Sequence, residues 1–155
     1  MSYLLPQYHT LFKLGYVASL ATKLSDTFAS ELGKAFGRTT FLITTLQIVP
    51  KGTEGAVSVE GTVAGVFGSI LMVSIAVQLG LIQRWVVEGM ICVLAAFLAT
   101  NVESYIGAVY QTDNEKYPWL TNEVVNGIMT MIGATIAMLI GSMMGVNHHY
   151  TSLSP

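Results

Sequence analysis

The chain has 155 residues, of which 52% are hydrophobic and only 10% are charged, and its formal net charge is −2. Soluble domains of this size usually contain about 25% charged residues, so the composition indicates one integral membrane domain. A slightly acidic chain without a basic cluster is poorly suited to phosphate backbones, which argues against nucleic acid as a partner. The single cysteine, Cys92, has no intrachain partner for a disulfide.

A first helix is expected over residues 9–36. Its apolar part, residues 15–22, is short enough to be re-entrant. The helix then continues into KLSDTFASELGKAFG, residues 23–37, which is crowded with polar groups although the chain as a whole is poor in them. The residues before it contain no basic segment and no small-residue cleavage site, so no cleavable signal peptide is expected there.

A polar loop is expected over residues 38–60. Its first part, TTFLITTLQIV at residues 39–49, is rich in β-branched residues and lies between Arg38 and Pro50, which favours an extended segment or a β-hairpin over a helix. The second part, PKGTEGAVSVEG at residues 50–61, contains three glycines and predicts an irregular loop.

Three further helices are expected over residues 62–82, 86–108 and 122–146, before a tail at residues 147–155. At roughly 1.5 Å per residue each is at least about 30 Å long, which is enough to cross the hydrocarbon core of a bilayer. The middle one can span only if Glu88 and Glu103 lie at its ends or face protein. The predicted fold class is therefore an all-α membrane protein with about four hydrophobic helices and a long polar loop.

Basic residues near the ends of the spans predict the orientation. Lys34, Arg38, Lys51 and Lys116 fall on one side, and Lys13 and Arg84 fall on the other. Because basic loops are retained in the cytoplasm, we expect the two long polar loops, 38–60 and 111–121, to face the cytoplasm or its organellar equivalent.

Small residues recur in steps of four along three of the expected helices. The three series are Ala29, Gly33 and Gly37; Gly61, Gly65 and Ser69; and Gly133, Ala137, Gly141 and Gly145. In lipid such stripes let helix backbones approach closely, so helix packing is favoured over ligand binding as their role.

The polar residues of the first helix lie on two neighbouring sectors. At about 100° per residue, Lys23, Asp26 and Ser30 share one face, which must point at protein or water. Asp26 and Glu31 then point about 140° apart. Either only one of the two is a ligand of a given ion, or the helix breaks near Ser30.

Each of these carboxylates also has a simpler explanation. Asp26 can pair with Lys23 three residues away, and Glu31 can pair with Lys34 at the membrane surface. Elsewhere, Glu54 and Glu60 are as well explained as solvated loop charges, and Thr121 or Asn122 would cap the last helix.

The chemistry best suited to this set is phosphoryl transfer. Mg²⁺ typically takes one or two protein carboxylates together with substrate phosphates. Backbone N–H groups in the turn at residues 52–55 are suited to cradle an anion, although the loop matches no standard nucleotide motif. A Ser/His/Asp arrangement is not supported, because the histidines His9, His148 and His149 lie in the terminal segments.

The segment KLSDTFASELGKAFGRTTFLITTLQIVPKGTEGAVSVEGTVAG resembles the signature region of the membrane family that contains plant plastid phytyl-phosphate kinase, its cyanobacterial counterparts and animal relatives. The resemblance continues through ATNVESYIGAVYQ and WLTNEVVN and covers most of residues 15–145. It extends over the C-terminal half of family members, which usually begin with several more membrane helices and a glycine-rich basic loop. It implies transfer of a phosphoryl group from a nucleoside triphosphate to a prenyl monophosphate, phytyl phosphate in photosynthetic members, for tocopherol and phylloquinone synthesis.

The resemblance also implies a set of site residues, carried over by position. The implied catalytic residues are Asp26, Glu31, Lys51, Glu54, Glu60, Glu103 and Asn126. The implied cofactor-binding residues are Ser25, Thr27, Gly52, Thr53, Gly55, Ser58 and Asn122. Asp26 with Glu31 or Glu54 would surround Mg²⁺, and Lys51 with the loop amides would hold phosphate. The nucleotide is left open among CTP, UTP, GTP and ATP.

The implied location is a chloroplast membrane, thylakoid or envelope, or a cyanobacterial membrane. The implied partners are prenyl phosphate, membrane lipid, and either an N-terminal partner chain or other membrane subunits, since activity is expected only where the other half is present or supplied in trans. The alternative is a non-catalytic subunit that derives from this family and belongs to a larger membrane complex, for example a photosynthetic complex. A transporter is less favoured, because the spans show no inverted repeat.

Overall fold

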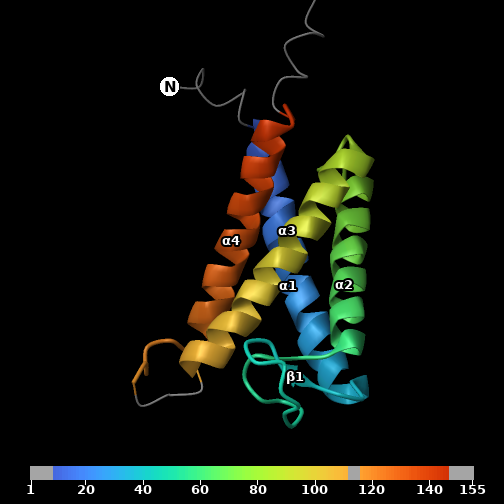
Figure 1. The fold of residues 1–155 in the computed structure, drawn as a ribbon. Helices are drawn as coiled ribbons and strands as arrows, with labels where there is room; N and C mark the ends of the chain where they lie inside the picture. The colour runs from blue at the N-terminus through green and yellow to red at the C-terminus, as the bar shows by residue number, and fades with distance from the viewer. Residues whose placement is uncertain (1–8, 112–115, 147–155) are drawn as a thin grey trace, which may run out of the picture.

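The computed structural model describes residues 9–111 and 116–146, and within them the chain forms a bundle of long helices (Figure 1). The helices are α1 (His9–Phe36), α2 (Val59–Gln78), α3 (Trp85–Ile106) and α4 (Asn122–Met143). A short π-helical segment, η2 (Gly107–Gln111), continues α3. The expected tail at residues 147–155, with His148 and His149, lies outside the described residues.

Three helical segments are long and apolar enough to cross a membrane, as the sequence predicts. They are Val59–Gln78, Trp85–Gln111 and Asn122–Met143, with mean hydropathies of 1.7, 1.8 and 1.9. Their bounds differ from the expected ones by a few residues because of local caps. The Ser58 hydroxyl accepts a hydrogen bond from the Gly61 amide at 3.0 Å and starts α2 early, whereas the turn at Gly80, with φ +69°, ends it early.

The first helix is the centre of the bundle. α1 is a continuous helix of 28 residues that contacts α2, α3 and α4. Its buried side chains include Leu14, Val17 and Thr22. It runs over the expected residues, 9–36, and does not turn back on itself, so the short apolar segment 15–22 is part of one longer helix. The polar part of α1 is only partly covered: Ser25 and Gly33 are buried, whereas Lys23, Glu31 and Lys34 are exposed.

Close backbone packing through glycine joins α1 to its neighbours. A Cβ atom placed on Gly65 of α2 would lie 3.0 Å from the Ser25 carbonyl oxygen and 3.1 Å from the Ala29 Cβ. A Cβ on Gly133 of α4 would overlap the side chain of Thr22. The small-residue stripes therefore serve helix packing, as predicted.

The loop after α1 contains a small antiparallel sheet. Strand β1 (Phe41–Leu42) pairs with β2 (Ala56–Val57), in the register Phe41 to Val57 and Leu42 to Ala56. Phe41 also forms an isolated antiparallel bridge with Ile48. The bridge between Phe41 and Ile48 confirms the expected hairpin. Strands β1 and β2 pair across a longer, glycine-containing segment and bring the chain back to the end of the bundle.

The two long polar loops lie at the same end of the bundle, and the tight α2–α3 turn lies at the other end (Figure 1). This arrangement places Lys34, Arg38 and Lys51 at one end of the bundle and Arg84 at the other end, as expected from the distribution of basic residues. That the loop end faces the cytoplasm stays a prediction.

Substitution of Gly65 by alanine tests the packing of α1 on α2. Gly65→Ala should lower the free energy of unfolding by about 1–3 kcal/mol, because the added methyl group meets backbone and Cβ atoms at 3.0–3.1 Å. Thermal unfolding in mild detergent measures the effect. Gly127→Ala is the matched control, because a Cβ there meets nothing within 4 Å. Equal unfolding temperatures for the two variants would contradict the packing argument.

Candidate functional site

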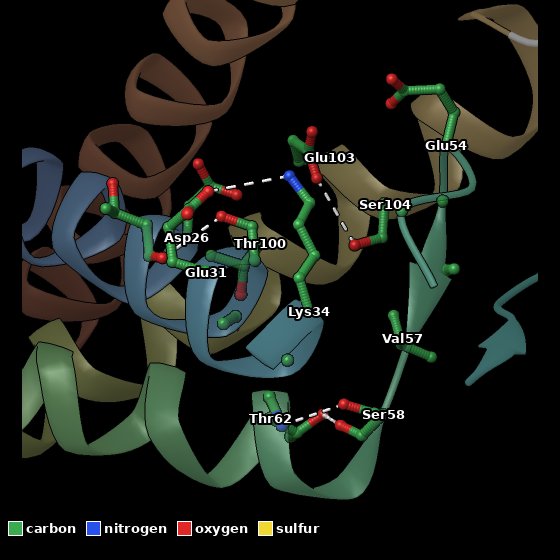
Figure 2. A pocket seen from close by; sticks show the side chains of 18 of the residues that line it. Asp26, Glu31, Lys34, Glu54, Val57, Ser58, Thr62, Thr100, Glu103 and Ser104 are labelled. Atoms are coloured by element: carbon green, nitrogen blue, oxygen red, sulfur yellow. Dashed lines mark hydrogen bonds and ion pairs between the residues drawn. The ribbon is translucent and has the colours of Figure 1, made fainter. Parts of the chain in front are cut away.

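A polar pocket of about 430 Å³ lies at the loop end of the bundle (Figure 2). All four long helices and the loop segment 52–58 contribute to its wall. Its charged and amide residues are Lys23, Asp26, Glu31, Lys34, Glu54, Glu103, Asn122 and Asn126. Hydroxyl groups come from Thr27, Ser30, Thr40, Thr53, Ser58, Thr62, Thr100 and Ser104.

Helical spacing explains how each element contributes several groups to the pocket. On α1, Lys23 and Asp26 are three residues apart and lie on one face, as the sequence predicted. On α4, Asn122 and Asn126 are four residues apart, so both side chains point the same way from the first turns of the helix. The Thr121 hydroxyl, which accepts a hydrogen bond from the Val124 amide, fixes where α4 begins.

Lys23 joins α1 to α4 inside this region. Its Nζ atom donates to Asn126 Oδ1 at 2.9 Å and to Asp26 Oδ2 at 3.3 Å. The Asp26 side chain is 15% exposed, whereas the Lys23 side chain is 48% exposed. The pairing expected of Asp26 as a simple ion pair is therefore present, and it is part of a contact between two helices.

The two carboxylates of α3 face protein, as crossing the membrane required. Glu88 is 4% exposed and accepts a hydrogen bond from the Gln83 amide at 3.1 Å, near the tight turn. Glu103 lines the pocket at the other end and accepts a hydrogen bond from the Ser104 hydroxyl at 3.4 Å. Its carboxyl group also lies within electrostatic range of Asp26 and Glu54.

The outer rim of the pocket carries more exposed groups. Glu31 pairs with Lys34 at 3.7 Å, and their side chains are 69% and 56% exposed, so this is the surface ion pair that the sequence offered as a simple explanation (Figure 2). Exposed pairs of this kind contribute little to stability. Glu54 extends from the loop on the α3 side of the rim.

A glycine allows the loop segment 52–58, here called the rim loop, to pack closely against α3. Gly55 has φ +72°, and a Cβ there would lie 2.5 Å from the Ser104 carbonyl oxygen. Gly52 has φ +85°, but a Cβ there would meet nothing within 4 Å. The Thr53 amide donates to the Pro50 carbonyl at 3.2 Å, so it is engaged within the turn and does not point at an anion.

Three of the residues implied by the family resemblance do not line the pocket. Ser25 is 2% exposed and packs against Gly65 of α2. Glu60 accepts a hydrogen bond from the Arg38 amide at 3.3 Å and so fixes the start of the loop. Lys51 is exposed on the loop outside the pocket wall.

The acidic residues expected around a metal are not gathered into one ready site. α1 is unbroken at Ser30, so Asp26 and Glu31 keep their divergent directions, and only one of them can bind a given ion. In the described part of the chain, no three Asp, Glu, His or Cys side chains come together as a metal-binding group. Asp26, Glu31 and Glu54 nevertheless all line the same pocket.

Several polar lining residues are absent from the implied set of site residues, among them Lys23, Thr40, Thr62 and Thr100. The position of Lys23 on the helix face of Asp26 is a usable signal, although the sequence alone indicates only a counter-ion for Asp26. The threonines offered no signal, because a hydroxyl in an apolar span most often bonds to its own helix, as Thr100 does with the Ala96 carbonyl at 3.0 Å.

The chain is similar to several known membrane proteins. The sequence profile described as integral membrane protein DUF92 matches residues 1–134. An uncharacterized membrane protein of Synechocystis is 61% identical over 126 residues, and Protein VTE6, chloroplastic, of Arabidopsis thaliana is 50% identical over 130 residues. An uncharacterized membrane protein of Methanocaldococcus jannaschii is 38% identical over 128 residues.

These alignments cover 81%, 84% and 82% of this chain but 46%, 38% and 50% of the three relatives, so the chain spans about half their length or less. No solved structure matches it. The two relatives from photosynthetic organisms are a chloroplastic protein and a cyanobacterial membrane protein. Because the profile covers most of its length and its helices are long and apolar, the chain belongs to the DUF92 family of integral membrane proteins.

Proposed function

We propose that this chain forms the polar site of a membrane prenyl-phosphate kinase, which transfers a phosphoryl group from a nucleoside triphosphate to phytyl or another prenyl monophosphate. The observation that carries the proposal is the pocket itself, where carboxylates, amides and ammonium groups from α1, α3 and α4 meet a glycine loop at the end of apolar spans. The family resemblance and the similarity to Protein VTE6, chloroplastic, support it.

The position of the pocket suits an amphiphilic substrate. Thr100 and Asn126 line it and belong to helical segments that are apolar enough to span the bilayer. The pocket therefore brings polar groups to the depth at which the head group of a membrane lipid meets its chain. A prenyl monophosphate would place its phosphate in the pocket while its hydrocarbon chain stays among lipid and apolar helices.

The reaction needs only positioning and charge stabilisation from the protein. An oxygen of the prenyl monophosphate forms a bond to the γ-phosphorus of the nucleotide, the bond from that phosphorus to the β,γ-bridging oxygen breaks, and a nucleoside diphosphate leaves. Glu54, Thr53 and Lys34 lie at the outer rim, where a nucleotide enters from water. This assignment leaves the identity of the base open.

The donor atoms of the pocket fit Mg²⁺ brought in with the nucleotide. They are the oxygen atoms of carboxylates and amides, which hard cations prefer, and Mg²⁺ commonly uses one or two carboxylates together with substrate phosphates. Asp26 and Glu103, from facing helices, would hold the ion, with Glu54 beside them. When bound, Mg²⁺ would neutralise charge on the transferred group.

Because the chain spans about half the length of its relatives or less, the proposal includes the rest of a family member, in the same polypeptide or as a partner chain. A location in a chloroplast or cyanobacterial membrane and a role in tocopherol synthesis belong to the same proposal.

A second candidate is a non-catalytic subunit of a larger membrane complex. The pairing of Asp26 with Lys23 and of Glu31 with Lys34 favours it, because each carboxylate already has a cation. The pocket shared by both pairs favours the kinase, since a purely structural bundle has no need of an open polar space of about 430 Å³.

Neutralising Asp26 distinguishes the two candidates. Asp26→Asn should lower kcat about 10²- to 10³-fold, because it removes a charge held at the reacting phosphates, while the nearly isosteric amide preserves folding. The measurement is conversion of phytyl phosphate to the diphosphate, with Mg²⁺ and each nucleoside triphosphate, in membranes that contain this chain and the rest of a family member. Glu31→Gln is the matched control and should change kcat less than about tenfold, because Glu31 lies in an exposed pair. Wild-type membranes inert with every nucleotide would support the structural subunit.

Moving the rim loop should weaken nucleotide use. In Gly55→Ala the methyl group collides with the Ser104 carbonyl in addition to the left-handed backbone cost of roughly 1–2 kcal/mol, so the loop that carries Glu54 must shift. We expect a rise of about tenfold or more in KM for the nucleotide. Gly52→Ala pays the backbone cost without the collision and should change KM much less. The same KM in both variants would show that the position of the loop does not matter to the nucleotide.

A further inference from the structure

Lys23 lies at the inner end of the pocket, away from the loops. α1 and α3 run toward the loop end, and α2 and α4 run away from it (Figure 1). On each helix one lining residue lies furthest from the loops, and these are Lys23, Thr62, Thr100 and Asn126. The other lining lysine, Lys34, lies at the outer end of α1, so the two lysines mark opposite ends of the pocket.

The contacts of Lys23 leave its ammonium group able to bind an anion. An ammonium has three N–H donors, and hydrogen bonds to Asn126 and Asp26 use two of them within the described residues. The bond to the neutral amide is the shorter, at 2.9 Å against 3.3 Å for the carboxylate. Asn126 therefore holds the ammonium in place without neutralising it, and the longer contact to Asp26 is the one that an incoming anion can replace.

The charges around Lys23 make it necessary to any anion that binds there. The Asp26 carboxylate contacts Lys23 at 3.3 Å, so the inner end is negative without the lysine. A phosphate dianion would be repelled by this carboxylate. Lys23 is the cationic side chain of the pocket wall that lies on this side.

We propose that Lys23 binds the phosphate of the prenyl monophosphate, and that it exchanges its contact with Asp26 for this phosphate when the substrate arrives. This inference rests on the proposed kinase function. The acceptor phosphate is anchored by a chain in the hydrocarbon, so it reaches the pocket at the depth of Lys23 and Asn126, whereas the nucleotide enters at the rim. The exchange also frees the Asp26 carboxylate from Lys23, so that it can bind the metal ion that arrives with the nucleotide.

Kinetics of a charge-removing variant test the assignment. Lys23→Met should raise KM for geranyl or phytyl monophosphate by about 10- to 100-fold, the usual effect of losing a charged hydrogen bond, and leave KM for the nucleotide within about threefold. Lys34→Met, at the outer end, is the matched control and should leave KM for the prenyl phosphate within about threefold. Lys23→Arg keeps the charge and should recover most of the lost affinity. A lysine that only ties α1 to α4 would change both KM values and stability together.

Chemical protection gives a second readout on the unmodified protein, which no folding defect can obscure. The Lys23 side chain is 48% exposed, so an amine-acylating reagent should label it in detergent, with the label located by mass spectrometry. Geranyl monophosphate should reduce the labelling at least about fivefold, whereas inorganic phosphate at the same concentration should not, because it lacks the hydrocarbon anchor.

The failures of the two proposals are distinguishable. Active wild-type enzyme whose Lys23→Met variant keeps its prenyl-phosphate KM, or whose Lys23 labelling is unaffected by geranyl monophosphate, would overturn the Lys23 assignment and leave the kinase in place. Wild-type membranes that neither bind nor phosphorylate prenyl phosphate would overturn both.

Discussion

The bundle depends on one constraint: the polar face of α1 must be shielded from lipid over the part of the helix that lies at membrane depth. A carboxylate or ammonium facing hydrocarbon is costly, so these groups face protein or water. α2 approaches the backbone of α1 through Gly61 and Gly65. α4 packs on the Thr22 side chain of α1 through Gly133, which leaves α3 to close the remaining side. The strands β1 and β2 return the loop over the end of the bundle. The polar pocket is what remains enclosed by this packing.

The helices and their spans could be predicted from sequence because hydropathy and length are local properties. The small-residue stripes were likewise sufficient to indicate packing, since four-residue steps place them on one face. Helix ends were less accurate, because they depend on single caps such as Ser58 and on the turn at Gly80. The pairing of Phe41 with Val57 was not predictable, because it joins residues on opposite sides of an irregular loop and no local pattern specifies that contact.

The site was partly accessible from sequence for a related reason. Helical geometry placed Lys23 and Asp26 together correctly, because both belong to one helix. Family resemblance then supplied polar positions on other elements, but it did not separate those that line the pocket from those that hold the fold. Ser25 and Glu60 are of the second kind: one packs under a glycine of α2, and the other accepts a hydrogen bond from the loop backbone. That distinction depends on how the helices cross, which a single sequence does not specify.

The central place of α1 has a consequence for biogenesis. Three segments are apolar enough to enter a bilayer independently, and α1 is not among them. Its lysines and acids disfavour partition from the insertion machinery into lipid until a neighbouring helix can cover them. The segment that carries the first residues of the site is synthesised before any of its three covering helices. The contacts that α1 makes with α2, α3 and α4 can therefore form only after these downstream segments have been translated.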